Sequence, residues 1–233
     1  MPLPETHAEG APGGKAVLGA IGVIGGTGPL GSGLARRLIA AGYTVVIGSR
    51  SAAKAEATVR DLAAGTARLT GADNITAATA AEVVLVTVPW SSQAAILEEI
   101  RPHVAGKLVV DATVPLVPPK VARVQLPPEH SAALAAQKRL GAGVRVVSAF
   151  HNVAAQKLHG SDEIDGDVLV FGDDPKDRQI VVALAKAMGL AAVHAGPLAN
   201  SVAAEALTSV LIGINRNYRV EGAGVRITGI PRD

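Results

Sequence analysis

The sequence predicts an α/β protein built on a doubly wound parallel sheet, and three observations support this class. Short apolar runs rich in Val and Ile alternate with longer amphipathic segments along most of the chain. Residues 83–88 form a continuous, largely β-branched run, as found in parallel strands that are covered on both faces. A glycine-rich turn separates the first apolar run from the first amphipathic segment. Strands and helices in this alternation form right-handed βαβ units, so we expect helices on both faces of one open sheet.

The first strand, turn and helix follow one another over residues 21–42. The run that begins at Ile21 passes directly into the glycine-rich turn. Pro29 is a favoured residue in the first turn of a helix, and Gly42 is a natural stop after it. Leu30, Leu34 and Leu38 form the expected buried stripe.

The remaining elements follow from the same patterns. Further strands are predicted at residues 44–48, 67–70, 83–88, 108–111, 144–148, 168–171, 191–194 and 225–227. Helices are predicted over residues 51–64, from Ser91 or Ser92 onward, over 131–140 and 175–188, and from about residue 200. Five prolines between residues 115 and 128 predict an extended excursion. The last helix carries Leu207, Val210, Leu211 and Ile214 on one face, which indicates core or a subunit interface.

The glycine-rich turn indicates a dinucleotide. Thr27, Gly28, Pro29 and Leu30 lie between a strand and a helix, where the backbone can approach a pyrophosphate at the positive end of the helix. NAD-binding chains usually carry a carboxylate at the end of the second strand, but here Ser49 and Arg50 stand there, with Lys54 one turn later.

These hydroxyl and cationic groups suit a 2′-phosphate through charge-assisted hydrogen bonds. The sequence therefore predicts a Rossmann-type domain that binds NADP(H).

The alternation of strands and helices loosens after His151, which predicts a second, smaller unit. We expect a flexible leader over residues 1–16, an NADP-binding Rossmann-type domain over 17–150, and a smaller C-terminal α/β domain over 151–233. The leader is rich in Pro and Gly and has no apolar core, so it is not a signal peptide.

Composition excludes several other classes. Aromatic residues make up 2% and the net charge is +2, which argues against nucleic-acid partners. The chain has no cysteine, and its six histidines show no metal-ligand spacing, so no metal site is expected. No stretch approaches the ~18 uninterrupted apolar residues of a membrane span. We expect a soluble, cytoplasmic protein with no membrane partner.

The reaction is harder to predict. Tyr43 and Tyr218 both lack the Lys four residues later that short-chain dehydrogenases need. His151 ends a strand at the ligand edge of the sheet and is the best-placed polar group, although a structural role is equally open. Trp90 also ends a strand there, where it would contact the cofactor or cap the core. Hydride transfer between two redox cofactors needs stacked faces more than it needs an acid or base.

Together these motifs resemble the NADPH-dependent coenzyme F420 reductases, or F420H2:NADP+ oxidoreductases, over about residues 20–227. The motifs are Gly25-Gly26-Thr27-Gly28, Gly48-Ser49-Arg50 with Lys54, Val88-Pro89-Trp90, Val146-Val147-Ser148-Ala149-Phe150-His151, Gly172-Asp173-Asp174 and Ala195-Gly196-Pro197-Leu198-Ala199-Asn200-Ser201. The chain departs from the family pattern at residues 111–113 and 152–154.

The resemblance implies a homodimer that transfers hydride between nicotinamide C4 and C5 of the deazaflavin F420. It implies that Trp90 and Val114 line the nucleotide site and that the Ala155 backbone meets the carboxamide. His151 and Val153 would lie against the deazaflavin, with Asn200 and the last strand nearby.

Two alternatives remain open at this point. The first is an NADP-dependent reductase of a small carbonyl or imine, which would need an acid that the sequence does not reveal. The second is an NADP-sensing module without turnover, which would contact a partner through the last helix.

Overall fold

The computed structural model describes residues 18–62, 66–160 and 164–231, so the predicted leader lies outside the described part. Its centre is one sheet of eight strands in the order β3-β2-β1-β4-β5-β6-β7-β8. The strands are β1 (Ile21–Ile24), β2 (Val45–Ser49), β3 (Leu69–Asp73), β4 (Val83–Val86), β5 (Leu108–Asp111), β6 (Arg145–Ser148), β7 (Asp167–Gly172) and β8 (Ala191–Gly196). The helices are α1 (Pro29–Ala40), α2 (Ala52–Leu62), α3 (Asn74–Ala80), α4 (Trp90–Ile100), α5 (Ala132–Leu140), α6 (Ala155–Leu158), α7 (Pro175–Ala187) and α8 (Ser201–Tyr218).

The predicted parallel, doubly wound sheet is confirmed. All neighbouring strands from β3 to β6 pair in parallel. The chain crosses from β3 past β2 and β1 to β4, which makes the switch point between β1 and β4 that is typical of Rossmann folds. β7 runs antiparallel to β6, and β8 runs parallel to β7. The C-terminal strands therefore continue the same sheet across residue 150, and the division into two domains there stays a prediction.

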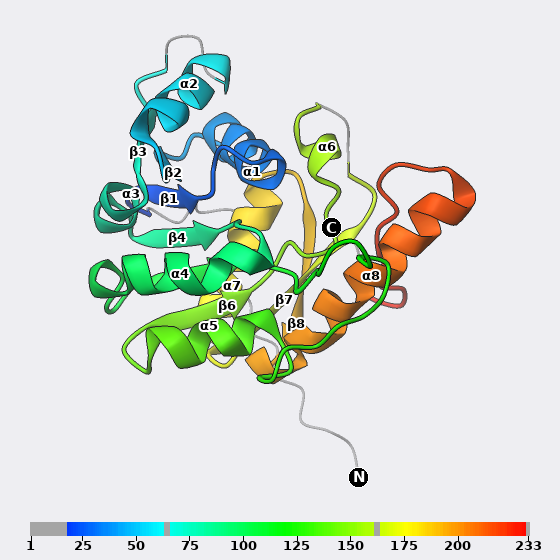
Figure 1. The fold of residues 1–233 in the computed structure, drawn as a ribbon. Coiled ribbons are helices and arrows are strands. Elements are labelled where there is room, and N and C mark those ends of the chain that lie inside the picture. The colour runs from blue at the N-terminus through cyan, green and yellow to red at the C-terminus, as the bar shows by residue number, and fades with distance from the viewer. Residues whose placement is uncertain (1–17, 63–65, 161–163, 232–233) are drawn as a thin grey trace.

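Helices cover both faces of the sheet, and each face has its own apolar core. Leu34 and Leu38 of α1 pack in one core with Leu184 of α7. On the other face, Leu97 of α4 packs with Ala136 of α5. Figure 1 shows α4 and α5 in front of the sheet and α7 behind it.

Several predicted elements need correction. Residues 225–227 form no strand. Val225 O accepts from Asp167 N at 2.6 Å, and Ile227 N donates to the Asp167 carboxylate at 2.6 Å. Only the first of these is a backbone–backbone bond, and a strand pairing needs more than one. The third strand is Leu69–Asp73 and lies later than predicted. α4 begins at Trp90 after Pro89, so neither Ser91 nor Ser92 caps it. The predicted helix end at residue 64 lies outside the described residues.

α8 is the longest helix and lies along the right of Figure 1. Leu198–Tyr218 is long and apolar enough to cross a membrane by length and composition, which is weak evidence because core helices pass the same test. One face of α8 is buried through Ala204, Glu205 and Leu211, while Val210 and Ile214 are 47% and 37% exposed. The predicted apolar face is thus only partly core.

Candidate functional site

The turn between β1 and α1 brings the backbone close to the carboxyl ends of the strands. Gly25 adopts a φ of +77°, a conformation that favours glycine. The N–H groups of Gly25 and Gly26 both donate to Gly48 O at 3.1 Å, which ties the turn to the end of β2. A Cβ at Gly31 would lie 2.7 Å from Gly25 O, so a side chain there would push the turn away from α1. The N-terminus of α1 is therefore held at this edge, where an anion is stabilised.

The end of β2 supplies the groups predicted for a 2′-phosphate. Ser49 is the last residue of β2 and is buried, while Arg50 and Lys54 are exposed at the entrance to α2. Neither cation forms an ion pair with any residue that the structure describes. Both charges are therefore available to an anionic ligand.

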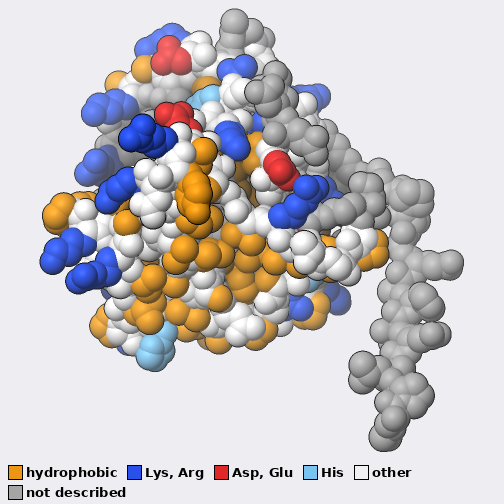
Figure 2. Space-filling view, turned by 90° about the vertical axis from the view of Figure 1, so that its right-hand side faces the viewer, with side chains coloured by type: hydrophobic (Ala, Val, Ile, Leu, Met, Phe, Trp, Pro, Cys, Tyr) orange, Lys and Arg blue, Asp and Glu red, His pale blue; other side chains and the backbone are white. Residues whose placement is uncertain are grey.

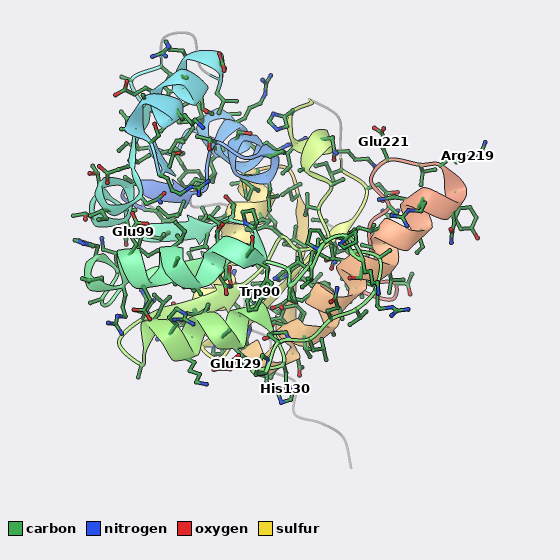
Figure 3. The ribbon with its side chains drawn as sticks, in the orientation of Figure 1. Trp90, Glu99, Glu129, His130, Arg219 and Glu221 are labelled. Carbon is green, nitrogen blue, oxygen red and sulfur yellow. The ribbon has the colours of Figure 1, made fainter. Side chains whose placement is uncertain are left out.

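One cavity of about 870 Å³ joins these two features. It lies at the carboxyl ends of the strands, where ligands bind in open α/β sheets. Its wall includes most of the predicted nucleotide contacts, namely Thr27, Gly28, Pro29, Leu30, Ser49, Arg50, Lys54, Trp90 and Val114. Trp90 is half-buried at the start of α4 and outside both apolar cores, which favours the cofactor-contact interpretation over the core cap (Figure 3).

His151 does not line this cavity. It borders a second, smaller hollow of about 350 Å³ between residues 151–154, the middle of α8 and residues 220–223, which Val153 also lines. The His151 side chain is 7% exposed and its Nε2 lies 2.8 Å from Ser148 Oγ. Burial lowers the pKa of His151 to about 4, so the imidazole is neutral at neutral pH.

The segment around His151 is fastened to α8. Thr208 Oγ1 donates to His151 O at 3.1 Å, and Asn152 Nδ2 donates to Ala204 O at 2.9 Å. Phe150 adopts a φ of +69°, which is strained for a residue with a large side chain. Such strain at the end of a strand is common at ligand sites.

α6 carries Ala155 and packs on α1. The Arg37 guanidinium donates to the carbonyl oxygens of Leu158, Lys157, Gly160 and Met188, each at 3.2 Å. Ala155 is half-buried and lines neither hollow, and Asn200 is exposed just before α8 and also lines neither. The smaller hollow therefore brings His151 and Val153 together, whereas the roles of Ala155 and Asn200 stay predictions.

A buried polar network lies beneath the large cavity. Gln93 Nε2 donates to the Asp111 carboxylate at 2.6 Å, and the Glu205 carboxylate accepts from Ala132 N at 2.6 Å and Ala133 N at 3.1 Å. Burial raises the pKa of Asp111 to about 6 and that of Glu205 to about 8, despite the lowering effect of these hydrogen bonds. The network joins β5, α4, α5 and α8.

Sequence reasoning missed part of the cavity wall. Asn74 after β3 and Thr87 after β4 both line it. The rule that ligands lie at the carboxyl ends of parallel strands would have pointed to these two. Pro118 and Val121 also line the cavity. The sequence of the proline-rich segment does not indicate which of its residues pack against the rest of the protein.

The fold and the cavity define a dinucleotide-binding protein of the Rossmann class. A family model described as NADP oxidoreductase, coenzyme F420-dependent, matches residues 20–115. The F420-dependent NADP reductase of Methanothermobacter thermautotrophicus is 37% identical over 227 residues, which cover 93% of this chain and 98% of that protein. The F420-dependent NADP reductase of Methanocaldococcus jannaschii is 35% identical over 221 residues, covering 90% and 98%.

The chain belongs to the family of F420-dependent NADP reductases, which confirms the resemblance seen in the sequence. A crystal structure from Arthrobacter sp. FB24 shares the fold with a TM-score of 0.75 and 22% identity. The match covers 91% of this chain and all of that one.

Proposed function

We propose that this chain is a soluble, cytoplasmic oxidoreductase that transfers a hydride directly between NADP(H) and coenzyme F420, with no covalent intermediate. The relatives that carry this activity in their names match the chain almost end to end. The single structural observation that supports it is the large cavity, which combines the α1 N-terminus with Arg50 and Lys54, two cations that form no ion pair with the described residues.

The residues of this cavity suit NADP(H). The glycine turn admits a pyrophosphate because Gly25 and Gly28 line the cavity without side chains at the start of α1. Ser49, Arg50 and Lys54 stand at the end of β2, where the adenosine ribose of a dinucleotide lies in this fold. Trp90 and Val114 offer apolar surface farther along the same cavity.

The second hollow suits the deazaflavin. Val153 provides apolar contact, and His151, which is neutral at neutral pH, adds no net charge to the hollow. Direct transfer moves a hydride from C4 of the nicotinamide to C5 of the deazaflavin. The protein's part is to hold the two faces together and to keep water away from them. In this proposal Ala155 contacts the nicotinamide carboxamide through its backbone, and Asn200 borders the deazaflavin.

The two alternatives from the sequence are less well supported. A carbonyl or imine reductase needs a proton donor, and the neutral His151 is a poor one at neutral pH. An NADP-sensing module would show tight cofactor binding with no turnover, and the relatives' names favour turnover.

We further infer a homodimer formed through the exposed side of α8. Val210 and Ile214 on this helix are exposed, as are Val117, Val124 and Leu126 in the proline-rich segment. Figure 2 looks at the side of the molecule where α8 lies and shows hydrophobic side chains gathered across it. A contiguous apolar surface of this kind is typical of an interface.

The experiment is a spectrophotometric assay with NADPH and F420. The visible absorbance of oxidised F420 should fall when NADPH and the protein are mixed with it. The matched variant is Arg50→Ala, which should raise the KM for NADPH about 10- to 100-fold because a bidentate phosphate partner is lost. No absorbance change in either direction would refute the proposal, and an equal effect on NADPH and NADH would refute the role of Arg50.

A further inference from the structure

Asn74 is a polar residue of the large cavity that no predicted role accounts for. It is the first residue of α3, directly after β3, and it lines the same cavity as Ser49 and Arg50. Its side chain is 2% exposed. A Cβ built on Gly48 would lie 3.3 Å from Asn74 Oδ1, so the amide lies against the end of β2.

The amide of Asn74 makes no hydrogen bond with any residue that the structure describes. Its oxygen is enclosed and has no partner, whereas the amide nitrogen is not among the enclosed atoms. The nitrogen is therefore the end of the amide that is turned toward the cavity. An enclosed polar atom without a partner destabilises the folded protein, so packing alone does not explain an Asn here.

Capping of α3 does not explain it either. The neighbouring Asp73 caps this helix, accepting from Thr76 N at 2.7 Å and from Thr76 Oγ1 at 3.0 Å. Asp73 is thereby engaged with α3 and is absent from the cavity wall. The side chain of Asn74, the next residue, is therefore not needed as a cap and is available to a ligand.

The geometry points to Asn74 as a specificity residue for the 2′-phosphate of NADP(H), to which its amide N–H donates. The inference rests on the proposed 2′-phosphate site and adds a residue from a second strand end to it. Ser49, Arg50 and Lys54 approach from β2 and α2, while Asn74 approaches from the β3–α3 junction. A phosphate dianion has only acceptor oxygens for these donors, and a neutral amide adds a donor without further cationic repulsion in the unbound site.

The test compares two nucleotides that differ only in the 2′-phosphate, adenosine 2′,5′-bisphosphate and 5′-AMP. Binding is followed through Trp90, the one tryptophan of the sequence, which lines the cavity. Asn74→Ala should weaken the bisphosphate about 10-fold or more and change AMP less than about 2-fold. Asn74→Asp keeps the shape of the side chain but replaces the donor with a negative charge, so it should weaken the bisphosphate further.

The control variant is Thr79→Ala, a polar side chain of α3 that is absent from the cavity wall and should leave both affinities unchanged. Retained AMP binding shows that each variant is folded. Equal weakening of both nucleotides by Asn74→Ala, or no weakening of either, would overturn the inference. If Arg50→Ala remains selective in the same assay, only the role of Asn74 fails. If Arg50→Ala is also unselective, the proposed 2′-phosphate site itself fails.

Discussion

At the scale of single residues, burial determines the protonation state of His151. Its imidazole is fixed by Ser148 Oγ on one side, and its carbonyl oxygen is fixed by Thr208 on the other. Because burial lowers the pKa of His151 to about 4, the folded protein takes up a proton there only as the pH falls toward about 4. The unfolded chain, with an ordinary histidine pKa near 6.5, binds it more readily.

This difference predicts an acid-sensitive contribution to stability. Between pH 7 and pH 5 the unfolded state gains the proton of His151 while the folded state does not, so the free energy of unfolding falls as pH falls. The loss should be on the order of 2 kcal/mol at pH 5. Urea unfolding of wild type and His151→Asn at both pH values isolates the effect, because the other titrating groups contribute equally to the free energy of unfolding of both proteins. A difference between the two proteins that does not change with pH would contradict it.

Residue-level prediction from the sequence led to the cavity wall where the signal was local. Thr27, Arg50 and Lys54 follow from a turn and a strand end that are contiguous in the chain, and all three line the cavity. Asn74 was missed because the predicted third strand ended at residue 70, whereas β3 runs to Asp73 and places Asn74 at its carboxyl end. Asn200 was placed near the deazaflavin by resemblance alone; it lines neither hollow, and its role stays a prediction.

At the scale of elements, α8 is held to α5 by buried polar contacts. The Glu205 carboxylate accepts from the first two N–H groups of α5, and Ser201 Oγ donates to Ser131 Oγ at 2.9 Å. A carboxylate at a helix N-terminus is stabilised by unpaired N–H groups and by the helix dipole. Burial has the larger effect, however, and raises the pKa of Glu205 to about 8.

The raised pKa makes the α5–α8 contact sensitive to base. Neutral Glu205 contributes stability that is present below its ordinary pKa near 4.5 and is lost as pH rises through about 8. Glu205→Gln keeps an acceptor but cannot ionise, so wild type should lose about 2 to 4 kcal/mol relative to it between pH 5 and pH 9. Denaturant titrations at the two pH values measure this. A constant gap between wild type and variant would show that Glu205 is ionised throughout.

Helices and strands were also predicted correctly where the sequence signal was local. The β-branched runs identified β1, β4 and β5, and the proline and glycine punctuation identified α1. α3 was missed because Asn74–Ala80 is short and rich in Ala and Thr, without an apolar period. The false strand at residues 225–227 was apolar enough, but it meets only the first residue of β7.

At the scale of the whole molecule, one sheet carries both hollows at a common edge. β7 and β8 extend the Rossmann sheet, and α8 then crosses back along the strand ends (Figure 1). The sequence did not predict this path of the chain. β7 runs antiparallel to β6, and the connection between them is an irregular segment that contains the short helix α6. The return leaves Val210 and Ile214 of α8 exposed.

The exposed side of α8 predicts dimerisation that a single charge can disrupt. Val210→Asp places an unpaired carboxylate in the inferred apolar interface, which should shift the protein from dimer to monomer in light scattering after gel filtration. Ile75→Asp is the control, since Ile75 is 40% exposed on α3 at the opposite side of the molecule and should leave the dimer intact. A wild-type monomer, or a Val210→Asp dimer of unchanged stability, would contradict the inferred interface.

The most direct test of the proposed reaction follows the hydrogen itself. NADPH that carries two deuterium atoms at C4 is mixed in ordinary water with F420 and the wild-type protein, and the reduced deazaflavin is analysed by mass spectrometry and NMR. Direct hydride transfer predicts one deuterium at C5 in each molecule of reduced F420. Reduced F420 without deuterium, or unreduced F420 after prolonged incubation, would contradict the account.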